Sequence, residues 1–376
     1  MALRTHHRRA GMTLVELLVV VAIIGLLAVT VLPNVASTTE SRRSREAARI
    51  ASTFVAKAQS RAIGRPEWAG VSIVPANANA RYGIDLFQAN VPQVYRGETF
   101  STRAYLETWA PLSRRLMLYD TQTAQVLPYP DRNIVSGDLI RFDGSGPWYE
   151  INTPANAVPH VWYCVLRGSL GGPAGASELT TQTSRNTPWP TQSLDPSRPQ
   201  DVTHTFEILR QPVRNGTAFT IPDGRCIDLT WSGYGPMSDY RTFVGEDVNR
   251  NRVLDANEDT NGNGKLDLNQ GAPTSILFDS TGRVRQLLLG TARITVTGPI
   301  YLLVGRVDRA TNDPSFPSDY DGTDDTKGFN WQYGDSFWIG IDPASGIAKT
   351  AECLPGTANV VASQKLIRSE MPAGGR

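Results

Sequence analysis

The sequence predicts an α+β protein in which one long N-terminal helix packs on an antiparallel β-sheet, with large loop insertions between the strands. Three observations support this fold class. An apolar run begins at Met12, a segment with helical periodicity follows it as far as Gly64, and short strands with turn sequences between them occupy the rest of the chain. Repeated hairpins after a single long helix are typical of a helix lying on an antiparallel sheet.

The first 11 residues are basic, and an apolar run follows them directly. From Met12 to Leu32 this run has 21 residues, which as a helix measure about 31 Å and match a hydrocarbon core of ~30 Å. We therefore expect a leader peptide at residues 1–11 and a transmembrane helix at 12–35, the first half of the long helix. The leader arginines place this end in the cytoplasm by the positive-inside rule, so the rest of the chain faces outward.

A secretory signal peptide is the alternative interpretation of this N-terminus. Its apolar region would be shorter, and the small residue of its cleavage site would follow that region. Here the small residue, Gly11, precedes the apolar run, which favours a retained membrane helix.

Glu16 is the charged residue within the apolar run. A carboxylate near the middle of a span costs roughly 2.5–3.5 kcal/mol on insertion scales, so a partner for it is expected. Cleavage after Gly11 would create a cationic α-amine at Met12, one helical turn from Glu16 on the same face. The same amine could pair with Glu16 of a neighbouring subunit, and such a pair would set the axial register of the two helices.

The sequence Gly11-Met12-Thr13-Leu14-Val15-Glu16, followed by an apolar helix, resembles the prepilin cleavage and methylation motif of type IV pilins and type II secretion pseudopilins. The resemblance implies a pilin-like fold, cleavage by a prepilin peptidase between Gly11 and Met12, N-methylation of Met12, and assembly through Glu16. It also implies that the chain lies in the inner membrane with its C-terminal domain in the periplasm. The partners that it implies are other pilin or pseudopilin subunits, an inner-membrane assembly platform and membrane lipid.

Residues 36–64 are expected to continue the helix with an amphipathic pattern. The apolar positions, spaced three or four residues apart, are Ala47, Ile50, Ala51, Phe54, Ala58 and Ala62. Arginines occupy other faces, at Arg42, Arg43, Arg45 and Arg49. We interpret them as a solvated face beside the membrane; binding of anionic phospholipid or DNA is the alternative.

Residues 65–376 are expected to form an outward-facing β-rich domain, with an insertion over about 88–199. Single strands are predicted at Ala69–Val74 and Val158–Leu166. Predicted hairpins join Phe206–Val213 to Thr217–Ile221 through Arg214-Asn215-Gly216, Ser275–Phe278 to Val284–Leu289, and Phe337–Ile341 to Ile347–Thr350.

The passage from helix to strand at residues 56–74 resembles the corresponding passage in the GspH/FimT group of minor pseudopilins. Residues 276–286 and 337–350 resemble the late hairpins of that group. The large insertion departs from the group's pattern. The resemblance implies a minor structural subunit of a type II secretion pseudopilus or a type IV pilus.

Residues 247–270 hold two adjacent frames that resemble the twelve-residue calcium loop. The oxygen donors of the first frame are Asp247, Asn249, Asn251, the carbonyl of Val253, Asp255 and Glu258, and those of the second are Asp259, Asn261, Asn263, the carbonyl of Lys265, and Asp267. Arg252 replaces the turn glycine of the first frame, and Gln270 cannot supply the last carboxylate of the second. No room exists for helices between the frames, so we expect structural Ca²⁺ in loops of the dockerin or thrombospondin type, with a polar Asn/Gly loop as the alternative.

Composition and motifs argue against an enzyme and against a nucleic-acid partner. Lys+Arg number 37 and Asp+Glu 36, a net charge of +1 that offers no bulk attraction to nucleic acid. Hydrolase, zinc-protease, P-loop and dinucleotide motifs are absent from the sequence. The alternative function is a filament subunit whose exposed domain binds DNA or a surface ligand, suggested by the adjacent Arg114 and Arg115 and by the tail residues Lys365, Arg368 and Arg376. Pairing among Cys164, Cys226 and Cys353 stays open.

Overall fold

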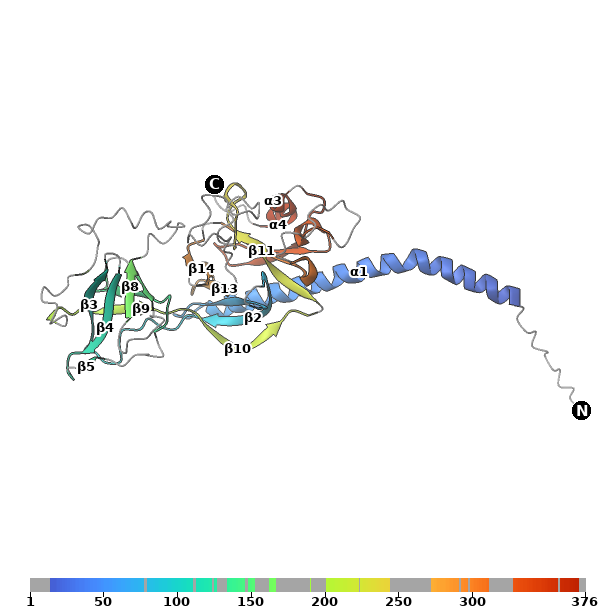
Figure 1. Cartoon of the computed structure of the whole chain (residues 1–376). Helices are drawn as coiled ribbons and strands as arrows, with labels where there is room; N and C mark the ends of the chain where they lie inside the picture. The colour runs from blue at the N-terminus through green and yellow to red at the C-terminus, as the bar shows by residue number, and fades with distance from the viewer. Residues whose placement is uncertain are drawn as a thin grey trace, which may run out of the picture.

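The computed structural model shows a long helix that projects from a body made of two β-sheets (Figure 1), which confirms the α+β class. It describes residues 14–371 except 78–79, 111–112, 124, 127–133, 146–147, 153–161, 167–189, 191–200, 223, 244–271, 291, 297, 311–326 and 358. Within the helices and strands, side chains are described except at 27–39, 108–110, 113–114, 125–126, 152, 162–166 and 292.

Helix α1 runs from Leu14 to Ala62. The amphipathic pattern of its second half is confirmed, because the predicted alanines, from Ala47 to Ala62, are fully buried and Phe54 packs against the same cluster. Small side chains on this face let the strands approach the helix axis closely. Among the residues and side chains described above, no helix has both the length and the hydropathy of a membrane span.

The larger sheet has 11 strands, and its neighbours pair antiparallel in the order β15-β14-β13-β1-β2-β11-β16-β17-β18, with β10 beside β2 and β12 beside β11. Its strands are β1 Ala69–Pro75, β2 Tyr82–Asn90, β10 Val213–Thr220, β11 Arg225–Tyr234, β12 Arg241–Thr242, β13 Thr274–Phe278, β14 Val284–Leu289, β15 Ala292–Ile294, β16 Ile300–Arg306, β17 Phe337–Ile341 and β18 Ala348–Glu352. Short helices accompany it, namely η2 Met237–Asp239, η3 Val307–Arg309, η4 Asn330–Gln332, α3 Val360–Ser363 and α4 Lys365–Glu370.

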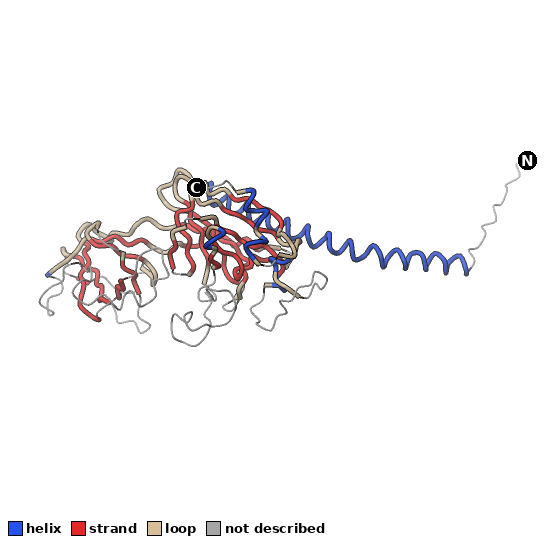
Figure 2. The backbone as a smooth tube through the Cα atoms, turned by 90° about the horizontal axis from the view of Figure 1, so that it is seen from above, coloured by secondary structure: helices blue, strands red, loops and turns tan. Residues whose placement is uncertain are grey.

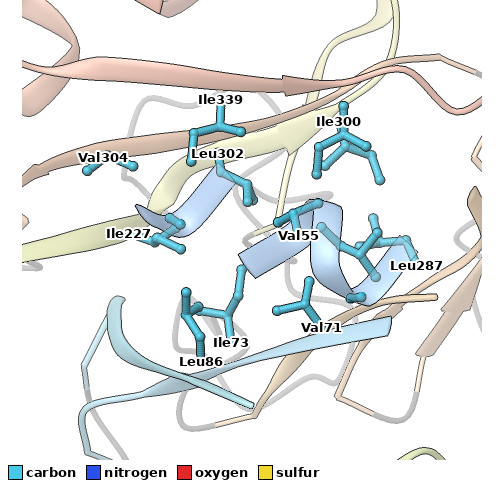
Figure 3. Close-up of a cluster of buried hydrophobic side chains, with 14 of the residues drawn as sticks. Val55, Val71, Ile73, Leu86, Ile227, Leu287, Ile300, Leu302, Val304 and Ile339 are labelled. Atoms are coloured by element: carbon cyan, nitrogen blue, oxygen red, sulfur yellow. The ribbon is translucent and has the colours of Figure 1, made fainter. Parts of the chain in front are cut away.

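This sheet curves around α1. Figure 3 shows Val55 of the helix between side chains such as Leu302 and Ile339 on one side and Ile73 on the other, all within one buried cluster. At the C-terminal end of the helix, the β13–β14 and β17–β18 turns meet, because the amide of Val284 donates to Pro343 over 3.0 Å. The helix therefore lies inside a concave sheet instead of resting on a flat one.

Two predicted hairpins are confirmed and one is wrong. The β13–β14 and β17–β18 hairpins occur as expected. The predicted hairpin around Asn215-Gly216 does not form, because these residues lie within β10, which pairs with β2, while the preceding strand β9 belongs to the smaller sheet. Pairing with a distant strand overrides the local preference of Asn-Gly for a tight turn.

The predicted insertion is not a loop, because between β2 and β10 the chain forms a second sheet of seven strands. They are β3 Thr102–Ala110, β4 Ser113–Asp120, β5 Gln125–Val126, β6 Leu139–Phe142, β7 Tyr149–Asn152, β8 Trp162–Leu166 and β9 Phe206–Leu209. The order is β3-β4-β8-β7-β6-β9, and His204, just before β9, exchanges backbone hydrogen bonds of 2.7 and 2.9 Å with Ala104 of β3. The sheet thus closes into a small barrel around its own apolar cluster.

Candidate functional site

The N-terminal part of α1 carries the one predicted assembly residue that the structure describes. Glu16 lies exposed in the first turn of the helix, where the helix dipole favours a carboxylate. Gly11 and Met12, the predicted cleavage and methylation residues, lie outside the described residues. The described geometry therefore places Glu16 one turn or less from the start of the helix.

Around Glu16, the helix surface is apolar and uncovered. Ten large apolar side chains between Leu14 and Leu26 are exposed, from 48% at Val19 and Val20 to 80% at Leu14. Consecutive helical residues point about 100° apart, so these side chains surround the helix. In Figure 1 this segment projects away from both sheets. A helix that is apolar on all sides is stable only when lipid or other helices cover it.

The larger sheet holds α1 with a half-buried ion pair where the helix leaves the sheet. Arg225, at the start of β11, is 3% exposed. Its guanidinium pairs with the Glu40 carboxylate and donates to Ser44 Oγ over 2.9 Å. The hydrogen bond from Arg225 holds the pKa of Glu40 below its usual value, against the effect of burial. The contact fixes both the rotation and the axial position of α1 in the body.

The arginines of α1 are mostly paired. Arg43 pairs with Glu40 at 3.1 Å, Arg45 with Glu352 at 2.7 Å and Arg49 with Glu46 at 2.7 Å. Three of the four predicted arginines are therefore in contact with carboxylates, which favours the solvated-face interpretation of these three residues.

Other arginines that suggested DNA binding also contact groups within the chain. Arg115 pairs with Glu107 at 3.6 Å. Arg368 of the C-terminal segment stacks on the ring of Tyr301, with 4.5 Å between the guanidinium carbon and the ring centroid. The side chain of Arg114 is not among those described.

The predicted calcium loops at 247–270 lie outside the described residues. So does a second acidic segment, with Asp319, Asp321, Asp324 and Asp325, whose sequence has no complete calcium frame and is interpreted as a solvated loop. In the part of the chain that the structure describes, no group of three or more His, Cys, Asp or Glu side chains could hold a metal. Phe243, just before the predicted loops, is held on the larger sheet. Its side chain is buried, and its amide donates to the carbonyl of Ser232 in β11 over 2.9 Å.

Two of the cysteines are free thiols. Cys226 and Cys353 are buried and unpaired, and burial raises the pKa of each thiol well above its ordinary value. Such thiols stay protonated and unreactive in the folded chain.

Sequence reasoning did not predict the Arg225–Glu40 pair or the closure of the barrel. Arg225 is isolated in an ordinary strand, and its partner is 185 positions away. At the barrel closure, His204 Nδ1 and Asp143 Oδ2 are 2.6 Å apart and His204 is 7% exposed. A lone Arg or His in a strand carries no local signal of such a distant partner.

Comparison with known proteins adds one finding at the N-terminus. The prokaryotic N-terminal methylation motif matches residues 6–32, which include Gly11, Met12 and Glu16. This motif is the signature of type IV pilin and pseudopilin prepilins, and it is a structural motif instead of an enzymatic one. No curated protein and no solved structure matches the chain.

Proposed function

We propose that the chain is a minor pilin or pseudopilin of the GspH/FimT type, assembled into a type II secretion pseudopilus or a type IV pilus. The observation that carries the proposal is the apolar, uncovered helix segment from Leu14 to Leu26, which coincides with the matched methylation motif. A structural subunit that packs by its helix requires such a surface.

In the proposed pathway, the helix at residues 12–35 first holds the chain in the inner membrane, with the body in the periplasm. A prepilin peptidase cuts between Gly11 and Met12 and methylates the new amine. Glu16 then pairs with the N-terminus of a neighbouring subunit as the assembly platform moves the chain out of the lipid. Neighbouring helices replace lipid around the apolar surface, so that little exposed area is created during the transfer.

The shape of the body supports a minor position in the filament. Figure 2 shows the smaller sheet and the N-terminal end of α1 at opposite ends of the molecule. A barrel displayed at the far end of every subunit would crowd a regular shaft. A subunit used in few copies, at the tip or during priming, avoids this crowding.

A substitution at Glu16 tests the assembly step. Glu16→Ala should lower incorporation into sheared filaments by about tenfold or more, because an unpaired N-terminus remains at the helix interface. Immunoblots of filament and membrane fractions measure this, and the membrane level should stay unchanged. Glu46→Ala is the matched control, since Glu46 is an exposed helical carboxylate that pairs with Arg49 of the same helix. Normal incorporation of Glu16→Ala would refute the proposed role of Glu16.

We also propose that residues 247–270 bind structural Ca²⁺. The support is the spacing of oxygen donors in two adjacent frames, in a segment that starts from the buried Phe243 and leads into β13. Bound Ca²⁺ would remove the repulsion among the carboxylates of the two frames.

Calcium should raise the melting temperature of the chain, and EDTA should reverse the rise. Differential scanning calorimetry with Ca²⁺, Mg²⁺ or EDTA measures the shift. The paired change Asp247→Asn and Asp259→Asn should abolish it, whereas Asp319→Asn, in the other acidic segment, should not. A melting temperature that is the same with Ca²⁺ and with EDTA would rule the site out.

A further inference from the structure

The Asn215-Gly216 dipeptide, which was predicted to form a hairpin turn, lies instead within strand β10. An asparagine followed by glycine is chemically labile, because glycine has no side chain to keep its backbone nitrogen away from the asparagine amide. The sequence has such dipeptides at Asn215, Asn261 and Asn263, and the structure describes the first of them. A regular strand protects the dipeptide by holding the backbone extended and paired, so its reactivity depends on how β10 is paired.

The pairing of β10 with β2 is interrupted directly after Asn215. Asn215 is the register partner of Gln88, and the next pair joins Phe219 to Leu86, so four steps along β10 correspond to two along β2. The residues in between, from Gly216 to Ala218, have no register partner in β2. Gly216 has φ of +80°, which is outside the range of a regular strand. The ladder therefore holds Asn215 but not the glycine that follows it.

The surroundings leave the dipeptide open to water. All residues from Val213 to Ala218 are exposed. Within the larger sheet β10 pairs with β2, and no other described strand pairs with it. A Cβ placed on Gly216 would meet no atom within 4 Å apart from its chain neighbours. In the described part of the chain, the Asn215 side chain forms no hydrogen bond. The side-chain amide can therefore approach the Gly216 nitrogen without breaking a contact.

The chemistry of this approach needs water alone. The deprotonated backbone nitrogen of Gly216 attacks the side-chain carbonyl carbon, Cγ, of Asn215. The new C–N bond closes a cyclic imide, the bond between Cγ and Nδ2 breaks, and Nδ2 leaves as ammonia with the proton that the backbone nitrogen lost. Water then opens the ring. Its attack at Cγ gives aspartate, and its attack at the main-chain carbonyl carbon gives isoaspartate, in which the main chain runs through Cγ.

We propose that Asn215-Gly216 is a site of spontaneous deamidation in the folded chain, at which water converts Asn215 to aspartate and isoaspartate. Either product carries a negative charge at neutral pH. Isoaspartate also adds a carbon to the main chain of β10, close to the pair between Val213 and Asn90 where the chain returns from the barrel. This inference does not rest on the proposed function, because it needs neither membrane insertion nor filament assembly.

A competing modification uses the same asparagine. Residues 215–217 match the Asn-x-Thr acceptor sequence of N-linked glycans. A glycan would occupy Nδ2 and prevent its loss as ammonia, so the two modifications exclude each other. Thr217→Ala removes the acceptor sequence and keeps the Asn-Gly dipeptide, which separates them.

Ageing of the purified full chain in detergent tests the proposal. Samples kept for weeks at neutral and at mildly alkaline pH are digested, and mass spectrometry measures the fraction of each asparagine whose NH₂ group has been replaced by OH. Asn215 should convert faster than Asn90, which precedes Val91, and faster than the buried Asn330. The rate should rise with pH, because the deprotonated nitrogen is the nucleophile. Electron-transfer fragmentation distinguishes isoaspartate from aspartate.

Two variants complete the test. Asn215→Gln should lose the product, because its longer side chain would have to close a larger ring, whereas Thr217→Ala should convert like the unaltered chain. Circular dichroism of each variant checks the fold. The proposal is overturned if Asn215 of the folded chain converts no faster than Asn90, if Thr217→Ala loses the conversion, or if Asn215 carries a glycan in the chain purified from its own cells.

Discussion

Arg225 and Asp138 are buried ionisable residues that connect separate parts of the molecule. Arg225 joins β11 to α1 through Glu40. Asp138 joins the barrel to the segment that returns to the larger sheet, since its carboxylate accepts the amide of Gln211 over 2.7 Å and that of Val135 over 2.9 Å. The contacts of Arg225 with Glu40 and of Asp138 with Gln211 link residues that are distant in the chain, so they contribute to the tertiary structure and little to local structure.

Arg225→Ala should lower the free energy of unfolding by ~3 kcal/mol, because it leaves Glu40 without its buried partner. Chemical denaturation in detergent measures the change. The matched control is Arg49→Ala, whose pair with Glu46 is exposed and should contribute less than ~1 kcal/mol. Equal effects of the two variants would show that the half-buried pair is not important for holding α1.

The contribution of Asp138 should depend on pH. Burial raises the pKa of this carboxyl from 3.8 to about 6, so the folded chain binds its proton more tightly than the unfolded chain. The resulting stabilisation is complete below pH 3.8 and is lost as the pH rises to about 6. Relative to Asp138→Asn, which does not titrate, the unaltered chain should lose ~3 kcal/mol over this range. Denaturation at a series of pH values measures this difference, and a constant difference would contradict the assignment.

Among the elements, β2 and β10 form the base from which the barrel extends. Asn90 at the end of β2 pairs with Val213 at the start of β10, so the chain leaves and re-enters the larger sheet at adjacent positions. Arg293 of β15 donates to the carbonyls of Leu209 and Arg210 over 3.3 and 3.2 Å, which orients the barrel. A closed sheet inserted between paired strand ends can fold with its own core.

Replacing residues 92–211 with a short Gly/Ser linker should therefore leave the larger sheet folded around α1. The expected cost is ~1–3 kcal/mol, because Leu209 no longer packs on Leu277 and Leu288. Thermal unfolding and near-UV circular dichroism measure the outcome. Extending the deletion to residue 220 also removes β10 and should destabilise the sheet further. If the shorter deletion fails to fold, the barrel is part of the main folding unit.

At the scale of the whole molecule, three parts follow one another along the long axis (Figure 2). They are the apolar N-terminal segment of α1, the larger sheet around the second half of this helix, and the barrel. Among the described side chains of α1, the curved sheet buries those from Ala47 to Ala62, and the large apolar ones from Leu14 to Leu26 stay exposed. The barrel lies farthest from that apolar segment. This arrangement suits a subunit that packs through its N-terminus and presents its far end to partners.

Local patterns were sufficient to predict several elements. The periodicity of residues 47–62 identified the buried face of α1, and turn sequences identified the β13–β14 and β17–β18 hairpins. These structures depend on residues close together in the chain. The hairpin around Asn215-Gly216 was predicted on the same basis and is wrong, because β10 pairs with β2 across more than a hundred intervening residues.

The sequence by itself predicted the leader and determined the apolar helix segment and the acidic residue within it, because these depend on local hydropathy and spacing. Only the tertiary structure decided that the insertion closes into a barrel, that the larger sheet wraps α1, and that Arg225 finds Glu40. Each of these features depends on contacts between distant segments of the chain. The free energy of such contacts comes mainly from burial of apolar surface between the segments, which no short stretch of sequence specifies.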